Sequence, residues 1–205
     1  MKRKIGIMGG TFDPIHIGHL ILGEVAYEQF ELDKVRFVPA GNPPHKRNRD
    51  GRATDEQRIS MVRDAIAGND RFELSLAEME MDGLTYTYRT LELFLTENPQ
   101  DELYFIIGAD SLFDFEQWMK PDKICQLCKL IVATRNQTAD DALNRQIEHL
   151  EKKYGGTFLK LNTPDLDISS KMLRGWVKKD KSIRYYVPET VRNYIKENNM
   201  YKDCI

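Results

Sequence analysis

The sequence predicts an α/β fold in which helices cover both faces of a mostly parallel, doubly wound sheet. Short apolar runs recur along the chain, amphipathic segments lie between them, and a glycine turn follows the first run. Near-continuous apolar runs are typical of strands that are buried on both faces of a parallel sheet. We expect such strands at residues 4–9, 34–41, 71–80, 102–109, 129–135 and 157–162.

The segments between these runs carry the periodicity of helices. Leu20–Leu32 places apolar side chains on one face, and a capping-box pattern at Thr54–Gln57 precedes a second apolar stripe. A third helix is expected over Tyr88–Glu97, where Pro99 closes it. A long polar helix is expected over about Ala139–Tyr154, where a glycine pair follows. This alternation of strands and helices predicts a Rossmann-like fold.

The pattern changes after Pro164, where two consecutive helices are expected. They cover "ISSKMLRGWVKK" and "PETVRNYIKENN", the second with Pro188 in its first turn. We therefore predict a nucleotide-binding α/β core over residues 1–164. A small C-terminal helical segment over residues 165–205 would pack on the same domain.

The overall charge favours neither nucleic acid nor an anionic membrane as a partner. The 205 residues include 30 Lys and Arg against 32 Asp and Glu, a net charge of −2. No apolar run approaches the roughly 20 residues that span a bilayer. The apolar core of "MKRKIGIMGG" is too short for a signal peptide. An odd number of cysteines is a poor disulfide framework, so we expect a cytoplasmic protein, and the sequence leaves open whether it forms a homo-oligomer.

Cys125 and Cys128 form a C-x-x-C pattern, which occurs in redox proteins and in half of some zinc sites. No second pair and no nearby histidine complete a metal-binding set in the sequence. Their context, "DKICQLCKLIV", places both on the buried side of a short helix. Core packing is the favoured interpretation of this pair.

Two glycines and two histidines stand together where the first strand passes into the first helix. Gly9 and Gly10 carry no Cβ, so another group can approach their backbone closely. In a doubly wound sheet this junction lies beside the ligand crevice, and the helix start presents N–H groups that attract phosphate. His16 and His19 would then donate hydrogen bonds to phosphoryl oxygens. The alternative is that the glycines form a turn while the histidines cap the helix and face solvent.

Several other phosphate and metal motifs are absent from the sequence. There is no Walker motif and no G-x-G-x-x-G fingerprint. A zinc site at His16 and His19 lacks a third ligand candidate nearby, so we expect no protein-held metal.

Two motifs together give the chain a family resemblance. "GGTFDPIHIGH" and "ISSKMLR" resemble the nucleotidylyltransferase superfamily, whose marks are (T/H)-x-G-H and I-S-S-x-x-[IVL]-R. Within this superfamily the chain is similar to the bacterial nicotinate-mononucleotide adenylyltransferases over residues 4–201. The narrower marks are "PAGNPPHK", "TYTYRTL", "FIIGADSL", Trp118 and "YYVPETVRNYI".

The resemblance implies an ATP site formed by both ends of the chain. His16, His19 and Arg174 are the implied catalytic residues, and an arginine suits polyphosphate because its guanidinium binds oxygens bidentately. The implied ATP-binding residues are Gly9, Gly10, Thr11, Phe12, His16, His19, Gly108, Asp110, Ile168, Ser169, Ser170 and Arg174. Asp110 would accept ribose hydroxyls. The alternative is that Ser169 and Ser170 have a structural role without a ligand, since serines commonly cap helices.

The resemblance also implies a site for nicotinate mononucleotide. Its implied residues are His45, Lys46, Thr85, Tyr86, Trp118 and Arg135. The loop at His45 and Lys46 would meet a phosphate, Thr85 and its neighbour would recognise the nicotinate carboxylate, and a tryptophan would stack on the pyridine ring. A solvated basic loop and a core tryptophan are the alternatives.

Two residues depart from the pattern of the resembled family. Lys171 stands where many relatives carry Thr or Ser, and Arg89 stands where they usually carry Asp. The first departure bears on the phosphate contacts, and the second on the segment that would recognise nicotinate.

The implied reaction is AMP transfer from ATP to nicotinate mononucleotide, which yields deamido-NAD and pyrophosphate in NAD biosynthesis. Mg²⁺ would arrive bound to ATP. A pantetheine-phosphate adenylyltransferase shares both phosphate motifs but is typically shorter and lacks the narrower marks. A class I aminoacyl-tRNA synthetase also has an H-I-G-H turn, but this chain lacks K-M-S-K-S. A nucleotide-binding protein without activity is the third alternative.

Overall fold

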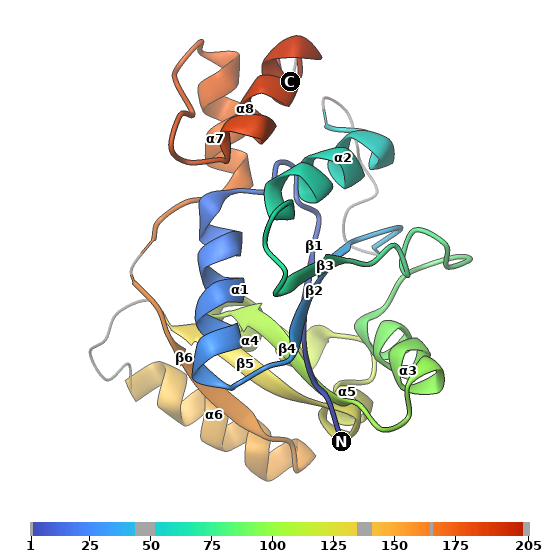
Figure 1. The fold of residues 1–205 in the computed structure, drawn as a ribbon. Coiled ribbons are helices and arrows are strands. Elements are labelled where there is room, and N and C mark those ends of the chain that lie inside the picture. Colours follow the sequence, from blue (N-terminus) through green and yellow to red (C-terminus); the bar gives the residue numbers. More distant parts are fainter. Residues whose placement is uncertain (1, 44–51, 135–140, 165, 203–205) are drawn as a thin grey trace.

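A six-stranded parallel sheet forms the centre of the molecule (Figure 1). The computed structural model describes residues 2–43, 52–134, 141–164 and 166–202. Its strands are β1 (Lys4–Gly10), β2 (Lys34–Pro39), β3 (Phe72–Leu74), β4 (Glu102–Gly108), β5 (Cys128–Thr134) and β6 (Phe158–Asn162). The strand order is β3-β2-β1-β4-β5-β6, and every neighbouring pair is parallel. The predicted Rossmann-like α/β fold is confirmed.

The helices divide between the two faces of this sheet (Figure 1). They are α1 (Ile17–Gln29), α2 (Asp55–Ile66), α3 (Thr87–Glu97), α4 (Ala109–Phe113), the 3₁₀ helix η1 (Phe115–Gln117), α5 (Pro121–Leu127), α6 (Asp141–Tyr154), α7 (Ser170–Lys178) and α8 (Glu189–Glu197). Buried side chains of α1, α2, α7 and α8 share one apolar cluster. Those of α3, α5 and α6 share the other.

Strand β4 shows why the strands carry apolar side chains on both faces of the sheet. Leu103, Phe105 and Ile107 point into the cluster with α3 and α6, whereas Tyr104 and Ile106 point into the cluster with α1 and α2. Successive strand side chains alternate between faces, so a strand covered on both sides needs a continuous apolar run. The run in "ELYFIIG" meets this requirement.

The predicted helices agree with the structure within a few residues. The predicted third strand is too long. The run over residues 71–80 forms a strand only at Phe72–Leu74, on the edge of the sheet. After Leu74 the amide of Ser75 still reaches Phe37, but the amides of Met79 and Glu80 then bond back to Leu76. These turn bonds end the pairing. The short elements α4 and η1 were not predicted from the sequence.

The helical C-terminal segment packs beside α2 and not over the sheet (Figure 1). Leu173 of α7 and Val191 and Ile195 of α8 are buried in the same cluster as α1 and α2. Ser169 caps α7 by accepting a hydrogen bond from the amide of Met172 at 3.2 Å. The division of the chain at residue 164 remains a prediction, because this packing is continuous with the core.

The prediction that Cys125 and Cys128 lie on one short helix is wrong. Cys125 lies half-buried in α5, and Cys128 is the first, buried residue of β5. None of the helices described is long and apolar enough to cross a membrane.

Candidate active site

A cavity of about 790 Å³ opens at the carboxyl ends of β1 and β4. The strand order reverses between these two strands, and open α/β sheets hold their ligands at such a reversal. The residues of the implied ATP site that line the cavity are Gly9, Gly10, Thr11, His16, His19, Gly108, Ile168, Ser169 and Ser170. The structure therefore brings both ends of the chain to one cavity.

The two histidines lie against each other at the start of α1. Their ring centroids are 3.7 Å apart with an interplanar angle of 29°, and the backbone N–H of His16 donates to Nδ1 of His19 at 3.2 Å. Phe12 packs its ring edge-on against His19 at 5.0 Å. His16 occupies the N-cap position, as the structural alternative predicted, but it is only 6% exposed and does not face solvent.

Burial and hydrogen bonding indicate the charge of the His16 ring and the tautomer of the His19 ring. Burial lowers the pKa of His16 to about 4, so this imidazole is neutral at pH 7. Nδ1 of His19 accepts a hydrogen bond and is therefore unprotonated. In the neutral form of His19 the proton lies on Nε2, which becomes a hydrogen-bond donor. At neutral pH, the His16 ring therefore carries no full positive charge.

Helix α7 is tied to the turn that follows β1. The Ser170 hydroxyl donates to the carbonyl of Pro14 at 2.9 Å. Arg174 Nη1 donates to the carbonyl of Asp13 at 2.5 Å and lies 3.6 Å from its carboxylate Oδ2. Tyr201 donates its hydroxyl to Oδ1 of Asp13 at 2.8 Å. The buried Asp13 thus joins the turn before α1 to the C-terminal segment.

Three residues of the implied ATP site do not line the cavity. Phe12 is 2% exposed and packs in the core, where it supports His19. Asp110 is exposed in the first turn of α4, although its neighbours Gly108 and Ala109 line the cavity. Arg174 contacts Asp13 beneath the turn. Their roles toward ATP remain predictions.

The implied acceptor residues within the described ranges lie on another wall of the same cavity. Thr85, Tyr86 and Trp118 all line it. Trp118 also packs edge-on against Phe105, with ring centroids 6.1 Å apart, so it borders both the core and the cavity. His45, Lys46 and Arg135 lie outside the described residues.

Arg89 has a structural role in this wall. Its Nη1 donates to the carbonyl of Leu84 at 2.9 Å and to that of Asp82 at 3.3 Å. These bonds tie helix α3 to the turn before Thr85. The other departure, Lys171, is exposed in the first turn of α7.

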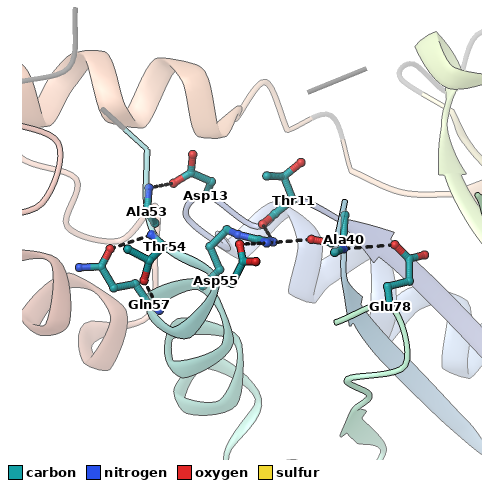
Figure 2. Close-up of polar contacts among 10 residues, drawn as sticks. Thr11, Asp13, Ala40, Ala53, Thr54, Asp55, Gln57 and Glu78 are labelled. Atoms are coloured by element: carbon teal, nitrogen blue, oxygen red, sulfur yellow. Dashed lines mark hydrogen bonds and ion pairs between the residues drawn. The ribbon is translucent and has the colours of Figure 1, made fainter. Parts of the chain in front are cut away.

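Sequence reasoning missed two ionisable residues beside the cavity. Glu78 lines it, and the 4% exposed Arg58 of α2 donates to the carbonyls of Thr11 and Ala40 (Figure 2). A signal for Arg58 existed, because it precedes Met61 and Val62 by three and four residues and so falls on the buried stripe of α2. No periodicity marks Glu78, which follows the short edge strand.

The structure offers no protein cage for a metal ion in its described ranges. No group of three or more His, Cys, Asp or Glu side chains there could hold one. At the turn, Oδ1 of Asp13 accepts hydrogen bonds from Tyr201 and from the amide of Ala53, whereas its buried Oδ2 has no hydrogen-bond partner among the described residues and lies 3.6 Å from Arg174.

Comparison with known proteins shows the family of this chain. Residues 7–175 match the cytidylyltransferase-like family, a span that includes both predicted phosphate motifs. This chain belongs to that family. A relative from Lachnoclostridium phytofermentans, named a probable nicotinate-nucleotide adenylyltransferase, is 41% identical over 97% of this chain and 99% of its own length. One of the same name from Synechococcus sp. (strain JA-3-3Ab) is 42% identical over 98% of this chain and 96% of its own.

Solved structures share the fold of this chain. Plasmodium falciparum nicotinic acid mononucleotide adenylyltransferase, solved in complex with NaAD, superposes with a TM-score of 0.77 at 21% identity, over 97% of each chain. A putative nicotinate-nucleotide adenylyltransferase from Vibrio parahaemolyticus superposes with a TM-score of 0.69 at 20% identity, over 98% of this chain and 96% of the other. The predicted resemblance to nicotinate-mononucleotide adenylyltransferases is confirmed by the relatives of 41–42% identity.

Proposed function

We propose that this protein transfers AMP from ATP to nicotinate mononucleotide, releasing pyrophosphate and forming deamido-NAD. The observation that carries this proposal is the pair His16 and His19 at the start of α1, on the wall of a cavity that Ser169 and Ser170 also line. The names of the relatives at 41–42% identity over nearly the whole chain support the choice of acceptor.

The reaction is a direct displacement at phosphorus. A 5′-phosphate oxygen of the mononucleotide attacks the α-phosphorus of ATP, the bond from that phosphorus to the bridging oxygen breaks, and its electron pair leaves with pyrophosphate. The nucleophile is already an anion, so no general base is required. Catalysis then depends on holding the two phosphates in line and on stabilising charge in the transition state.

The histidine pair supplies donors for that charge. Nε2–H of His19 donates to an α-phosphate oxygen, and its direction is fixed because Nδ1 is held by the amide of His16. His16 donates from a buried, neutral ring that lines the same wall. The backbone around Gly10 can approach the phosphates closely because no side chain intervenes.

The start of α7 holds the leaving pyrophosphate in this proposal. The first turn of a helix presents unpaired N–H groups toward an anion. Arg174 has further N–H donors beyond the one used on Asp13, since a guanidinium carries five. Ser170 keeps α7 in register with the turn through Pro14.

Mg²⁺ enters as part of the substrate. ATP of this enzyme class typically reacts as a complex with a divalent cation, which the phosphates and water coordinate. The absence of a three-ligand cluster in the described ranges is compatible with that arrangement.

The acceptor lies toward Thr85, Tyr86 and Trp118 in this proposal. Trp118 has the aromatic surface to stack on a pyridine ring, and Thr85 is held by a hydrogen bond from its amide to the carbonyl of Asn42 at 3.1 Å. His45, Lys46 and Arg135 complete the acceptor site in the proposal as phosphate contacts. The odd cysteine count supports a cytoplasmic location, and light scattering would establish whether the protein forms a homo-oligomer.

One experiment tests the reaction and its alternatives. The protein is incubated with Mg²⁺, ATP and one acceptor at a time: nicotinate mononucleotide, nicotinamide mononucleotide or phosphopantetheine. Pyrophosphate release is followed, and the product is identified by mass. We expect the highest kcat/KM with nicotinate mononucleotide. A preference for phosphopantetheine, or ATP binding without turnover of any acceptor, would reject the proposal.

A further inference from the structure

One peptide group beside the cavity is held at both ends by ionisable side chains. Nη2 of Arg58 donates to the carbonyl oxygen of Ala40 at 2.7 Å. The N–H of the same peptide, at Gly41, donates to Oε2 of Glu78 at 3.4 Å (Figure 2). The C=O and N–H of a trans peptide point in opposite directions, so the two side chains hold the peptide plane from both sides. We call Arg58 and Glu78 the peptide clamp.

The arginine of the clamp also reaches the turn between β1 and α1, residues 11–16, which we call the phosphate turn. Its Nη1 donates to the carbonyl of Thr11 at 2.9 Å, and its charge is paired with Asp55 at 2.8 Å. Figure 2 shows the contacts of Thr11, Ala40 and Asp55 converging on one group. A single planar guanidinium therefore bonds both the residue after β1 and the residue after β2, in addition to the backbone bond from the amide of Ala40 to the carbonyl of Gly10 at 2.8 Å. These residues begin the phosphate turn and the acceptor loop, by which we mean the segment after β2, described at residues 40–43.

The glutamate of the clamp is held by helix α3, which follows the predicted acceptor residues Thr85 and Tyr86. The Thr90 hydroxyl of α3 donates to its Oε1 at 2.9 Å. The backbone packs closely here as well, because a Cβ on Gly41 would lie 2.0 Å from the carbonyl oxygen of Glu78. Gly41 therefore packs directly against the segment with Glu78, whose side chain is held by α3.

We propose that Arg58 and Glu78 are positioning residues, which align the phosphate turn with the acceptor loop so that the two substrate phosphates meet in line. This inference rests on the proposed AMP transfer. Neither side chain is assigned contact with a reacting atom, and both act through the Ala40–Gly41 peptide and through Thr11. A displacement of about 1 Å at a reacting centre can cost about 10²-fold in rate, so a small rotation of this peptide is enough to matter.

The first test replaces the planar guanidinium of Arg58 by the ammonium group of lysine, which keeps the positive charge. Arg58→Lys cannot bond both carbonyls with one rigid plane, and Arg63→Lys on the exposed side of α2 is the matched control. We expect Arg58→Lys to lower kcat by about 10- to 100-fold while the Kd for an ATP analogue changes by less than about 3-fold. The control should stay within about 2-fold of the wild type.

The second test separates positioning from folding. Glu78→Ala removes the acceptor of the Gly41 amide, Glu78→Gln keeps a carbonyl there, and Glu80→Gln is the exposed control. Amide exchange at Gly41 and kcat are measured on each variant, together with its melting temperature. We expect Glu78→Ala to speed amide exchange at Gly41 and to lower kcat. Glu78→Gln should lie between Glu78→Ala and the wild type in both the exchange rate and kcat.

Each outcome decides the inference. Faster exchange or a lower melting temperature with kcat unchanged would show a purely structural role and overturn it, as would Arg58→Lys with wild-type kcat. A wild type that transfers no AMP would overturn the proposed function, and this role with it. An active wild type with unaffected variants would overturn the positioning role alone.

Discussion

The amide of His16 donates to Nδ1 of His19 at 3.2 Å, and the two rings stack at a centroid distance of 3.7 Å. The backbone of His16 therefore orients the ring of His19. It leaves Nε2 of His19 as the donor that can face a phosphate. The pairing explains why two histidines stand three residues apart at the start of α1.

Replacing His19 should remove most of the turnover without unfolding the protein. His19→Ala loses a donor aimed at the transition state, and such losses typically cost about 10²- to 10³-fold in kcat. His19→Asn should retain more activity because its amide can still donate. Steady-state kinetics measure the effect, and circular dichroism checks the fold. His149→Ala, on the half-exposed histidine of α6, is the control, and activity of His19→Ala equal to that control would contradict the assignment.

The buried ring of His16 should make stability depend on acidity. Its pKa falls from an ordinary 6.5 to about 4 on folding, so the unfolded chain binds the proton more strongly between these values. Stability is therefore lost as the pH falls from 6.5 toward 4, by on the order of 3 kcal/mol for this group. Urea unfolding of the wild type and of His16→Asn, which keeps a good N-cap, measures the difference. Identical pH dependence of the two proteins would refute the buried, neutral imidazole.

The hydroxyl of Tyr201 should stabilise the phosphate turn from the C-terminal segment. It donates to the buried carboxylate of Asp13 at 2.8 Å, so Tyr201→Phe leaves that oxygen with one donor fewer. We expect a loss of about 1–3 kcal/mol in the free energy of unfolding. Tyr185→Phe, on a residue that is 78% exposed, is the matched control. Equal urea midpoints for the two variants would show that the bond contributes nothing.

The cysteine pair should be chemically inert. Burial raises the pKa of Cys125 to about 11 and raises that of Cys128 further, so little thiolate exists near pH 8. In a Cys204→Ser background, labelling with a thiol reagent should be slow in the native state and fast in denaturant. Rapid native labelling of either residue would instead favour a redox role.

The fold could be predicted because its signals are local. Continuous apolar runs such as "ELYFIIG" indicate strands covered on both faces, and the glycine turn before His16 indicates the ligand crevice. The third strand was overestimated because turn bonds at Leu76 compete with pairing on an edge strand.

The clamp could not be predicted in the same way. Arg58 carries a weak signal as a charge on an apolar stripe, but its partners Thr11 and Ala40 lie 47 and 18 residues away in the chain. The contact of Arg174 with Asp13 spans 161 residues. Such contacts follow from the meeting of strand ends in space, which local sequence patterns do not encode.

The most direct test is a crystal structure of the protein with Mg²⁺ and an ATP analogue whose α,β bridge cannot be cleaved. The account predicts an α-phosphate oxygen within hydrogen-bonding distance of Nε2 of His19, with the outer phosphates at the start of α7. An analogue bound with its triphosphate away from both helix starts would contradict it.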